Sequence, residues 1–242
     1  MLVSETFVSL QGEGSLAGMP SWFVRLSGCN LRCRWCDTPY ASWSPEGEKR
    51  TVESLVEEAA GSGVRHAVVT GGEPLIFPQC ASLCARLREA GLHVTIETAG
   101  TLEGAGEKGG EPAKCDLLSL SPKLRNSTPA NDPRDPLGVW TERHEARRLN
   151  PDALRALLDR APDAQCKFVV TGEADLAEID AILAEINRGR ERLKPSQVFL
   201  MPEGTIVPSP ERVAWVVRLC LARGWRYAHR LHIELFGDTK GT

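Results

Sequence analysis

The sequence predicts an α/β fold, an incomplete TIM-type barrel of about six parallel strands, formed as a single domain over residues 1–242. Three observations predict this fold. Short apolar runs alternate with helical segments, the connections between them are short, and the runs are fewer than the eight strands of a closed barrel. Alternation with short connections gives right-handed βαβ units.

The expected strands are short, bounded and rich in branched apolar residues, as buried parallel strands are. They cover residues 22–26, 67–70, 94–97, 117–120, 167–170 and 198–201, with a further short strand near 226–231. The expected helices cover residues 51–60, 79–90, 151–160, 175–188 and 210–222, with Thr51, Asn150 and Ser209 as N-terminal caps.

Two stretches interrupt the alternation. Residues 103–112 are rich in Gly and Glu, and we expect a solvated surface excursion there. Residues 125–150 contain three prolines, and we expect a long loop that acts as a lid or a dimer contact.

Composition narrows the class of protein. A net charge of -3 and a pI near 6.0, with basic and acidic residues interspersed, argue against direct nucleic-acid binding. No long apolar run and no signal-peptide pattern is present, so we expect a cytoplasmic protein without membrane contact. Eight cysteines are too dilute for a disulfide scaffold, and five of them lie in apolar stretches as expected small core residues: Cys80, Cys84, Cys115, Cys166 and Cys220.

The other three cysteines, Cys29, Cys33 and Cys36, form a CxxxCxxC motif directly after the first expected strand. A closed structural zinc site needs four protein ligands, and the next candidate ligand along the chain is His66. A cubane iron-sulfur cluster takes one thiolate per iron, so three thiolates leave one iron open for chemistry. The alternatives are half of a zinc knuckle or three unrelated structural cysteines.

The strand at 67–70 is followed by Gly71-Gly72-Glu73-Pro74. Two glycines let a ligand approach the backbone closely, and the Glu73 carboxylate can bind an ammonium group. Taken alone, this segment is equally a tight turn.

The cysteine motif and Gly-Gly-Glu-Pro at the next strand end together resemble the radical S-adenosylmethionine (SAM) superfamily. Further segments are similar to the 7-carboxy-7-deazaguanine synthases within it: Gln11-Gly12-Glu13-Gly14, Phe23-Val24-Arg25, Asp37-Thr38, Ser121-Pro122-Lys123 and Phe199-Leu200-Met201-Pro202-Glu203-Gly204. The resemblance implies a radical SAM core that converts 6-carboxytetrahydropterin to 7-carboxy-7-deazaguanine with loss of ammonia, a ring contraction on the route to queuosine. It also implies a 4Fe-4S cluster, SAM and Mg²⁺ as cofactors.

The same resemblance implies roles for individual residues. The three cysteines would hold the cluster, and Thr38 would bind Mg²⁺ together with the substrate carboxylate and water, since Mg²⁺ prefers oxygen ligands. SAM would be contacted by Trp35, Asp37, Gly72, Glu73, Ser121, Pro122, Lys123, Met201, Pro202, Glu203 and Gly204. The substrate would be contacted by Leu10, Gln11, Gly12, Glu13, Arg25, Thr70 and Thr242.

Several of these residues also have ordinary roles. Arg25 suits a carboxylate because a planar guanidinium binds it bidentately, although a surface ion pair is the alternative. Thr38 can cap the loop after Asp37, Trp35 can pack, and Lys123 can be solvated. The closing segment departs from the family in having Phe236 where Trp is more frequent, which leaves the role of Thr242 open. His229 and His232 are expected to be structural.

Two other functions remain open from the sequence. A glycyl-radical activase has the same cluster spacing and acts on a protein substrate. An electron-transfer module would use the three cysteines without SAM. For the synthase, the resemblance implies an external electron donor of flavodoxin or ferredoxin type and a homodimer.

Overall fold

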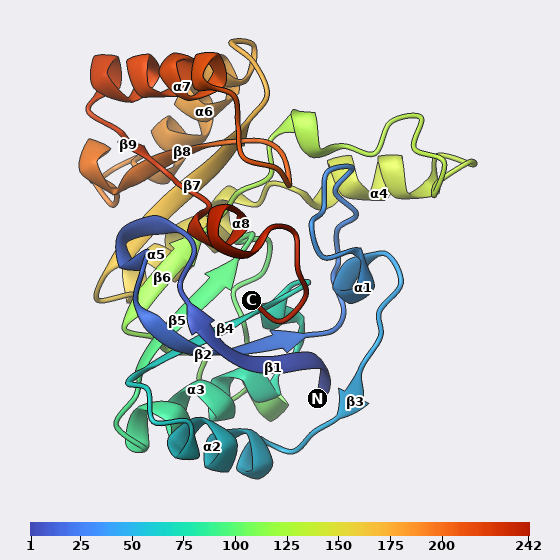
Figure 1. Ribbon diagram of the computed structural model, residues 1–242, viewed down its shortest axis with the longest axis vertical. Helices are drawn as coiled ribbons and strands as arrows, with labels where there is room; N and C mark the ends of the chain where they lie inside the picture. The colour runs from blue at the N-terminus through green and yellow to red at the C-terminus, as the bar shows by residue number, and fades with distance from the viewer.

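One nine-stranded sheet organises the computed structural model, which describes residues 1–242 (Figure 1). Its strand order is β3-β1-β2-β4-β5-β6-β7-β8-β9. From β2 through β4 to β9 the pairing is parallel, whereas β1 pairs antiparallel with both β2 and β3. The strands are β1 (Leu2–Leu10), β2 (Pro20–Leu26), β3 (Glu48–Lys49), β4 (His66–Gly71), β5 (His93–Thr98), β6 (Leu117–Leu120), β7 (Ala164–Val170), β8 (Val198–Pro202) and β9 (Arg226–Tyr227). Because the edge strands β3 and β9 do not pair with each other, the barrel is open.

Helices connect the parallel strands. They are α1 (Pro39–Ser42), α2 (Val52–Gly61), α3 (Gln79–Glu89), α4 (Val139–Arg147), α5 (Pro151–Arg160), α6 (Asp175–Ile186), α7 (Pro210–Arg223) and α8 (Leu231–Phe236). Short 3₁₀ turns are η1 (Gly14–Leu16), η2 (Pro74–Ile76), η3 (Glu107–Gly109), η4 (Arg125–Ser127) and η5 (Pro195–Gln197). In Figure 1, α2 and α3 lie together at one end of the sheet and α6 and α7 at the other. None of the helices combines the length and the apolar composition that crossing a bilayer requires.

Strand β7 shows how the two faces of the sheet are divided. Cys166, Phe168 and Val170 belong to a core cluster of 36 buried residues between the sheet and its helices. Lys167 and Val169 point to the other face, where they line a pocket. Successive side chains of a strand alternate between faces, so a run of seven buried residues serves both the core and the pocket.

The six principal strands and five expected helices are confirmed within one to three residues at their ends. The caps are confirmed as well: the side chains of Thr51, Asn150 and Ser209 accept hydrogen bonds from backbone N–H groups of α2, α5 and α7. Each of these bonds satisfies one of the free N–H groups at a helix start.

Three features differ from the sequence-based expectation. The chain opens with a strand, β1, that was not expected. The expected strand near 226–231 ends at Tyr227, and α8 begins at Leu231. The expected loop at 125–150 contains α4, whose sequence VWTERHEAR is mostly polar and buries only His144, so it lacks the apolar periodicity that identifies a helix.

Candidate active site

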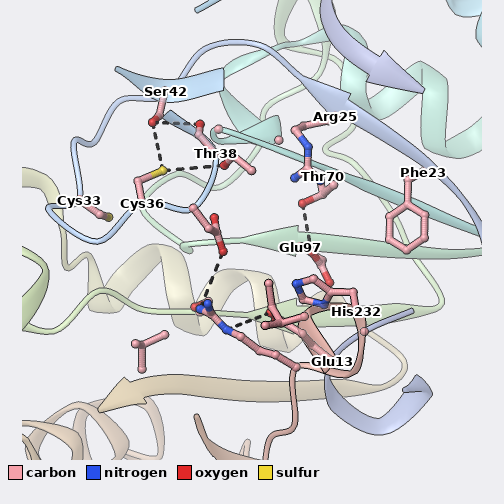
Figure 2. Close-up of a pocket in the computed structure, with 18 of the residues that line it drawn as sticks. Glu13, Phe23, Arg25, Cys33, Cys36, Thr38, Ser42, Thr70, Glu97 and His232 are labelled. Atoms are coloured by element: carbon pink, nitrogen blue, oxygen red, sulfur yellow. Dashed lines mark hydrogen bonds and ion pairs between the residues drawn. The ribbon is translucent and has the colours of Figure 1, made fainter. Parts of the chain in front are cut away.

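A pocket of about 450 Å³ lies at the carboxyl ends of the parallel strands, which is where α/β folds place their ligands (Figure 2). Its wall takes one or more residues from each of seven strands, from the loop 29–42 and from the segment after β9. The strand residues include Arg25, Thr70, Glu97, Ser119, Lys167 and Met201.

Cys29, Cys33 and Cys36 all line this pocket, and none is in a disulfide. Burial, with a smaller contribution from the nearby Glu73 carboxylate, raises the pKa of the Cys29 thiol to about 12. Burial also raises the pKa of Cys33. A thiolate at either position therefore needs positive charge beside it, which bound iron supplies.

The donor set fits a cubane cluster. Thiolates are soft ligands suited to iron, and the chain brings three of them to one cavity. No three His, Cys, Asp or Glu side chains are grouped closely enough to hold a single metal ion. A cubane does not require such a group, because each thiolate binds a different iron.

Hydrogen bonds fix the loop that carries the cysteines. Trp43 Nε1 donates to the carbonyl of Cys33 at 3.0 Å, and the N–H of Arg34 donates to Ser127 O at 2.9 Å. The N–H of Arg32 donates to Nδ1 of His144 at 3.2 Å. The segment 125–148 therefore holds the cysteine loop from outside. This role differs from the lid or dimer contact that we expected for the segment.

Thr38 and Ser42 stand next to Cys36. The Oγ of Ser42 lies 3.1 Å from Cys36 Sγ, and the Oγ1 of Thr38 lies 3.8 Å from it (Figure 2). Hydrogen bonds to a ligating sulfur tune the potential of a cluster. Thr38 also lines the pocket, so its hydroxyl is open to a bound ligand or ion.

The Gly-Gly-Glu-Pro segment has a structural task that the sequence did not reveal. A Cβ on Gly72 would lie 2.2 Å from the carbonyl oxygen of Gly28 and 2.7 Å from that of Ala41, so glycine is required for backbone packing. Gly72 lines the pocket, but Glu73 does not. Its fully buried carboxylate accepts bonds from Thr98 Oγ1 at 2.7 Å and from the N–H groups of Leu75 and Ala99. The Glu73 side chain is thus engaged in joining β4 to β5 instead of facing the expected ammonium ligand.

Ser121, Lys123 and Trp35 come together on one side of the pocket. Lys123 Nζ donates to Ser121 Oγ at 2.9 Å and lies 5.6 Å from the centre of the Trp35 ring. Trp35 Nε1 donates to the carbonyl of Asn126 at 3.2 Å. Pro122 lies between Ser121 and Lys123 in sequence but does not line the pocket.

Of residues 199–204, only Met201 lines the main pocket. Pro202 and Gly204 border a small neighbouring cavity, and the N–H of Glu203 donates to Val170 O at 3.1 Å. Arg230 joins this segment to the rest of the site, because its Nε donates to Met201 Sδ at 3.0 Å and its guanidinium lies 3.8 Å from Asp37. Asp37 also lines the pocket.

The loop after β1 brings Leu10, Gln11, Gly12 and Glu13 to the pocket. A Cβ on Gly12 would lie 1.9 Å from Nδ1 of His232, so the glycine makes room for the imidazole. The carbonyl of Gly12 accepts from the N–H of Leu231 at 2.9 Å. The amino-terminal loop and α8 are thereby fixed to each other.

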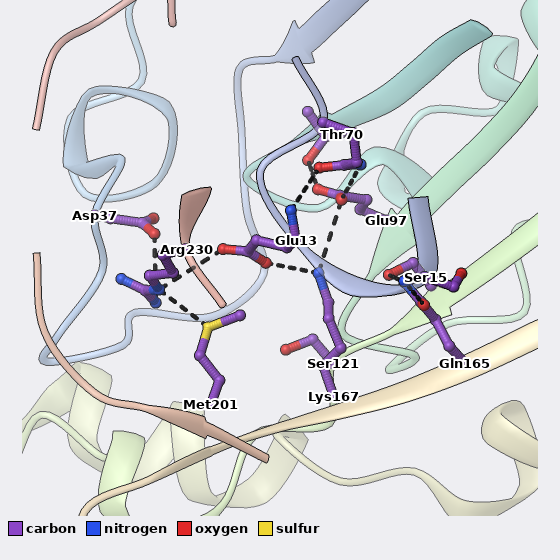
Figure 3. Close-up of polar contacts among 12 residues, drawn as sticks. Glu13, Ser15, Asp37, Thr70, Glu97, Ser121, Gln165, Lys167, Met201 and Arg230 are labelled. Atoms are coloured by element: carbon purple, nitrogen blue, oxygen red, sulfur yellow. Dashed lines mark hydrogen bonds and ion pairs between the residues drawn. The ribbon is translucent and has the colours of Figure 1, made fainter. Parts of the chain in front are cut away.

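A charged network forms another part of the wall (Figure 3). Lys167 Nζ lies 2.7 Å from Glu13 Oε2 and 3.7 Å from Glu97 Oε1. Glu97 also accepts from Gln11 Nε2 at 3.1 Å and from Thr70 Oγ1 at 3.0 Å. Burial opposes ionisation of Glu13, but Lys167, Arg230 and His232 outweigh it and lower the pKa of Glu13 to about 2.

Arg25 is held from behind. Its Nε donates to Glu5 Oε1 at 2.6 Å, and the Tyr40 hydroxyl donates to the same oxygen at 2.8 Å. The terminal nitrogens of the guanidinium have no hydrogen-bond partner within the protein and remain available to a ligand in the pocket. Burial disfavours the charge, yet Tyr40 and Glu5 raise the pKa of Arg25 above its ordinary value.

Comparison with known proteins shows which family the chain belongs to. The Radical SAM superfamily model matches residues 23–124. The chain is 46% identical over 243 residues to the 7-carboxy-7-deazaguanine synthase of Rhodopirellula baltica, covering 100% of this chain and 89% of the relative. It is 43% identical over 245 residues to the synthase of Halobacterium salinarum, covering 99% and 92%. The chain belongs to the 7-carboxy-7-deazaguanine synthase family.

A solved structure has the same fold. The crystal structure of QueE from Escherichia coli superposes with a TM-score of 0.67 at 26% identity, covering 96% of this chain and 94% of that one. The radical SAM core expected from the sequence is confirmed by this similarity and by the open, mostly parallel sheet. Membership of the superfamily implies a 4Fe-4S cluster and SAM.

Most of the residues expected to form the synthase site do share one pocket. Thr242 is among them, together with Thr239 and Lys240 of the closing segment, and the Lys240 ammonium lies 4.4 Å from the centre of the Tyr40 ring. The expected residues that do not line it are Glu73, Pro122, Pro202, Glu203 and Gly204.

Sequence reasoning missed several residues of the synthase pocket, chiefly Glu97, Lys167, Arg230 and His232. A signal existed for Lys167 and Glu97, since each is a charged residue in a run expected to be a buried strand. Such residues are rarely buried without a partner. His232, which was expected to be structural, lies in the pocket wall beside Gly12.

Proposed function

We propose that this chain converts 6-carboxy-5,6,7,8-tetrahydropterin to 7-carboxy-7-deazaguanine with release of ammonia, the ring-contracting step of 7-deazapurine biosynthesis. This activity is supported by the name of its relatives and by the alignments, which cover nearly the whole chain. The observation that carries it is a single pocket that holds three thiols, the Arg25 guanidinium with free terminal nitrogens, and the carboxylates of Glu13 and Glu97. These groups complement a substrate that has a carboxylate at one end and N–H donors at the other.

Arg25 binds the substrate carboxylate in this proposal. Glu5 and Tyr40 fix the guanidinium through Nε, so its two terminal nitrogens can form a bidentate pair. A pre-oriented guanidinium loses less conformational freedom when the ligand binds.

The pyrimidine edge of the pterin lies against the loop after β1. The backbone of Leu10, Gln11 and Gly12 supplies donors and acceptors, while Glu13 and Glu97 supply carboxylate acceptors for the ring N–H groups. Thr70 holds Glu97 through its hydroxyl and faces the same cavity. Thr242 closes the pocket from the carboxyl-terminal segment.

Mg²⁺ binds at Thr38 together with the substrate carboxylate and water. A single hydroxyl is a weak ligand for an ion that keeps several waters, so binding of the ion depends on substrate. The pocket exposure of Thr38 supports this assignment.

Cys29, Cys33 and Cys36 hold the cluster, and SAM lies among Trp35, Asp37, Gly72, Ser121, Lys123 and Met201, which share the pocket. The remaining expected contacts, Glu73, Pro122, Pro202, Glu203 and Gly204, act by shaping the backbone next to it. When bound and reduced, this cofactor pair would supply the radical chemistry for removing hydrogen from the pterin carbon that bears the carboxylate. The residues of the chain orient the substrate and exclude water from the site.

An external donor of flavodoxin or ferredoxin type supplies the electron, and the protein acts as a cytoplasmic homodimer. The donor and the homodimer rest on the family alone, and the location rests on the composition of the sequence. They are tested by activity with each purified donor, by fractionation and by sedimentation.

The first experiment is anaerobic reconstitution with iron and sulfide, followed by SAM, Mg²⁺, a reductant and the pterin. Mass spectrometry should detect 7-carboxy-7-deazaguanine. Cleavage of SAM with the pterin untouched would overturn the proposed substrate and favour a glycyl-radical activase. A reconstituted protein with no SAM-dependent spectral change would favour an electron-transfer module.

A further inference from the structure

Lys167 lies in the middle of β7 with only 4% of its surface exposed, on the face of the strand that lines the pocket. Its neighbours in sequence, Cys166 and Phe168, are buried in the main core on the other face. A lysine at such a position is rare unless it is paired, because removing an ammonium from water costs several kcal/mol.

The partners of Lys167 are two carboxylates from two other elements. Its Nζ lies 2.7 Å from Glu13, in the loop after β1, and 3.7 Å from Glu97, at the end of β5. Figure 3 shows the ammonium between the two acidic side chains. Both carboxylates also line the pocket.

The surroundings of the two carboxylates differ. Glu13 faces two further basic groups, since Arg230 lies 3.7 Å away and the His232 ring is nearby. Glu97 has no salt-bridge partner other than Lys167, and its side-chain hydrogen bonds come from the neutral groups of Gln11 and Thr70. The His232 ring lies near Glu97 as well as near Glu13. Asp37 faces Arg230 and not this pair.

Two carboxylates confined in one site do not both ionise without a cation, because like charges at short range raise the proton affinity of one of them. A protonated carboxyl presents an O–H donor, whereas an ionised one only accepts. The charge state of the pair therefore decides whether the pocket accepts hydrogen bonds from ring N–H groups.

We propose that Lys167 is a positioning residue that keeps Glu13 and Glu97 ionised together, so that both accept hydrogen bonds from the N–H groups of the bound pterin. The identity of the ligand rests on the proposed function, but the charge state of the two carboxylates does not.

The ionisation of Lys167 itself agrees with this role. Burial favours the neutral amine, yet Glu13 and Glu97 reverse that effect and raise the pKa of Lys167 above its ordinary value. Lys167 thus stays a cation at neutral pH and does not act as a base.

The test uses K167M, which removes the charge and keeps an unbranched side chain, and K167R, which keeps the charge. K114M serves as the matched control, since Lys114 is exposed and pairs only with Glu111. Infrared difference spectra of the full reconstituted protein against the wild type at neutral pH should show an added C=O band of a buried protonated carboxyl in K167M alone. The subtraction cancels any contribution from Glu73, whose buried carboxyl has a pKa raised by burial in every variant. The band should disappear in K167M/E97Q or in K167M/E13Q, which leave a single carboxylate.

Steady-state kinetics supplies the second readout. In K167M the KM for the pterin should rise roughly 10- to 100-fold, the factor that corresponds to one lost hydrogen bond to a charged group. This loss should shrink as the pH rises, because the extra proton then leaves. K167R should recover most of the affinity, while K114M should match the wild type.

Absence of the carboxyl band from K167M, with an unchanged KM, would overturn the proposal. Equal impairment of K167R and K167M, without the band, would show that Lys167 acts only by packing. If K167M does not fold, K167M/E13Q relieves the like-charge repulsion and must fold better for the proposal to stand. If the wild type does not convert the pterin, the proposed function fails, and the infrared result still decides the charge state.

Discussion

Nδ1 of His144 accepts a 3.2 Å hydrogen bond from the backbone N–H of Arg32, the residue before Cys33, while Nε2 lies 2.9 Å from Ser127 Oγ. Because Nδ1 accepts, it carries no proton, and the neutral imidazole has its proton on Nε2. A second proton on the ring, at Nδ1, would place that N–H group against the backbone N–H of Arg32. The cysteine loop is therefore held by a histidine that must stay neutral.

This contact predicts a pH dependence of stability. Burial lowers the pKa of His144 to about 4, whereas an unfolded histidine titrates near 6.5. Between these values the unfolded chain binds a proton that the folded one does not, so the contribution is complete above pH 6.5 and is lost as the pH falls toward 4. The loss should be on the order of 2 kcal/mol in urea unfolding of the cluster-free protein. H144N keeps an acceptor but does not titrate, so it should show a flatter profile, and identical profiles would contradict the assignment.

Replacing any one of Cys29, Cys33 or Cys36 with Ala should abolish the brown chromophore and SAM cleavage, because a cubane with two protein thiolates is not retained. Iron and sulfide content after anaerobic reconstitution gives the measurement. Cys220→Ala is the matched control, since this cysteine is buried in the main core. Full iron content and SAM cleavage in any of the three variants would exclude that residue as a ligand.

Arg25→Ala should leave the cluster intact and raise the KM for the pterin roughly 10- to 100-fold, through loss of charge-assisted hydrogen bonds. Glu5→Gln should raise it less, because the guanidinium remains but is oriented less firmly. Iron content and uncoupled SAM cleavage serve as controls for both variants. Unchanged pterin affinity in Arg25→Ala would mean that the carboxylate binds elsewhere.

Thr38→Val removes a hydroxyl while keeping the shape of the side chain. It should raise the Mg²⁺ concentration needed for half-maximal activity by roughly the 10- to 100-fold by which losing a metal-site partner weakens affinity. Thr38→Ser should behave like the wild type. An identical Mg²⁺ requirement in the valine variant would place the ion at another site.

Gly72→Ala should destabilise the fold by roughly 1–3 kcal/mol, since its Cβ would meet the backbone oxygens of Gly28 and Ala41 at 2.2 and 2.7 Å. Those neighbours belong to the main chain and cannot rotate away. Gly172→Ala is the matched control, because a Cβ there meets nothing within 4 Å. Equal urea midpoints for the two variants would show that the backbone yields at no cost.

The parallel strands, their helices and the edge of the sheet that carries the pocket could be predicted from the sequence, because each depends on local signals. Branched apolar runs identify buried strands, and capping residues identify helix starts. The cysteine spacing likewise lies within one loop. The single domain over residues 1–242 stays a prediction.

What could not be predicted depends on contacts between distant segments. Lys167 forms an ion pair with Glu13, which is 154 residues away in the sequence. No local sequence pattern pairs a lysine in one apolar run with a glutamate in a glycine-rich turn. Helix α4, which contains His144, has too few apolar residues to be predicted from their spacing. The reason is that it holds a polar loop and does not fill the core. Glu73 appeared suited to a ligand, and only the fold reveals that Thr98 and Ala99 already satisfy it.

The hydrogen bond from Leu231 to Gly12 joins segments near opposite ends of the chain. Only Ile233 of the six residues of α8 is buried, so this contact should open at a lower free energy than the strands beneath it. Hydrogen exchange should accordingly release the Leu231 amide well before those of β4 and β5. The side of the pocket formed by α8 can then admit ligands by local opening, while the sheet that carries Arg25 and Glu97 stays folded.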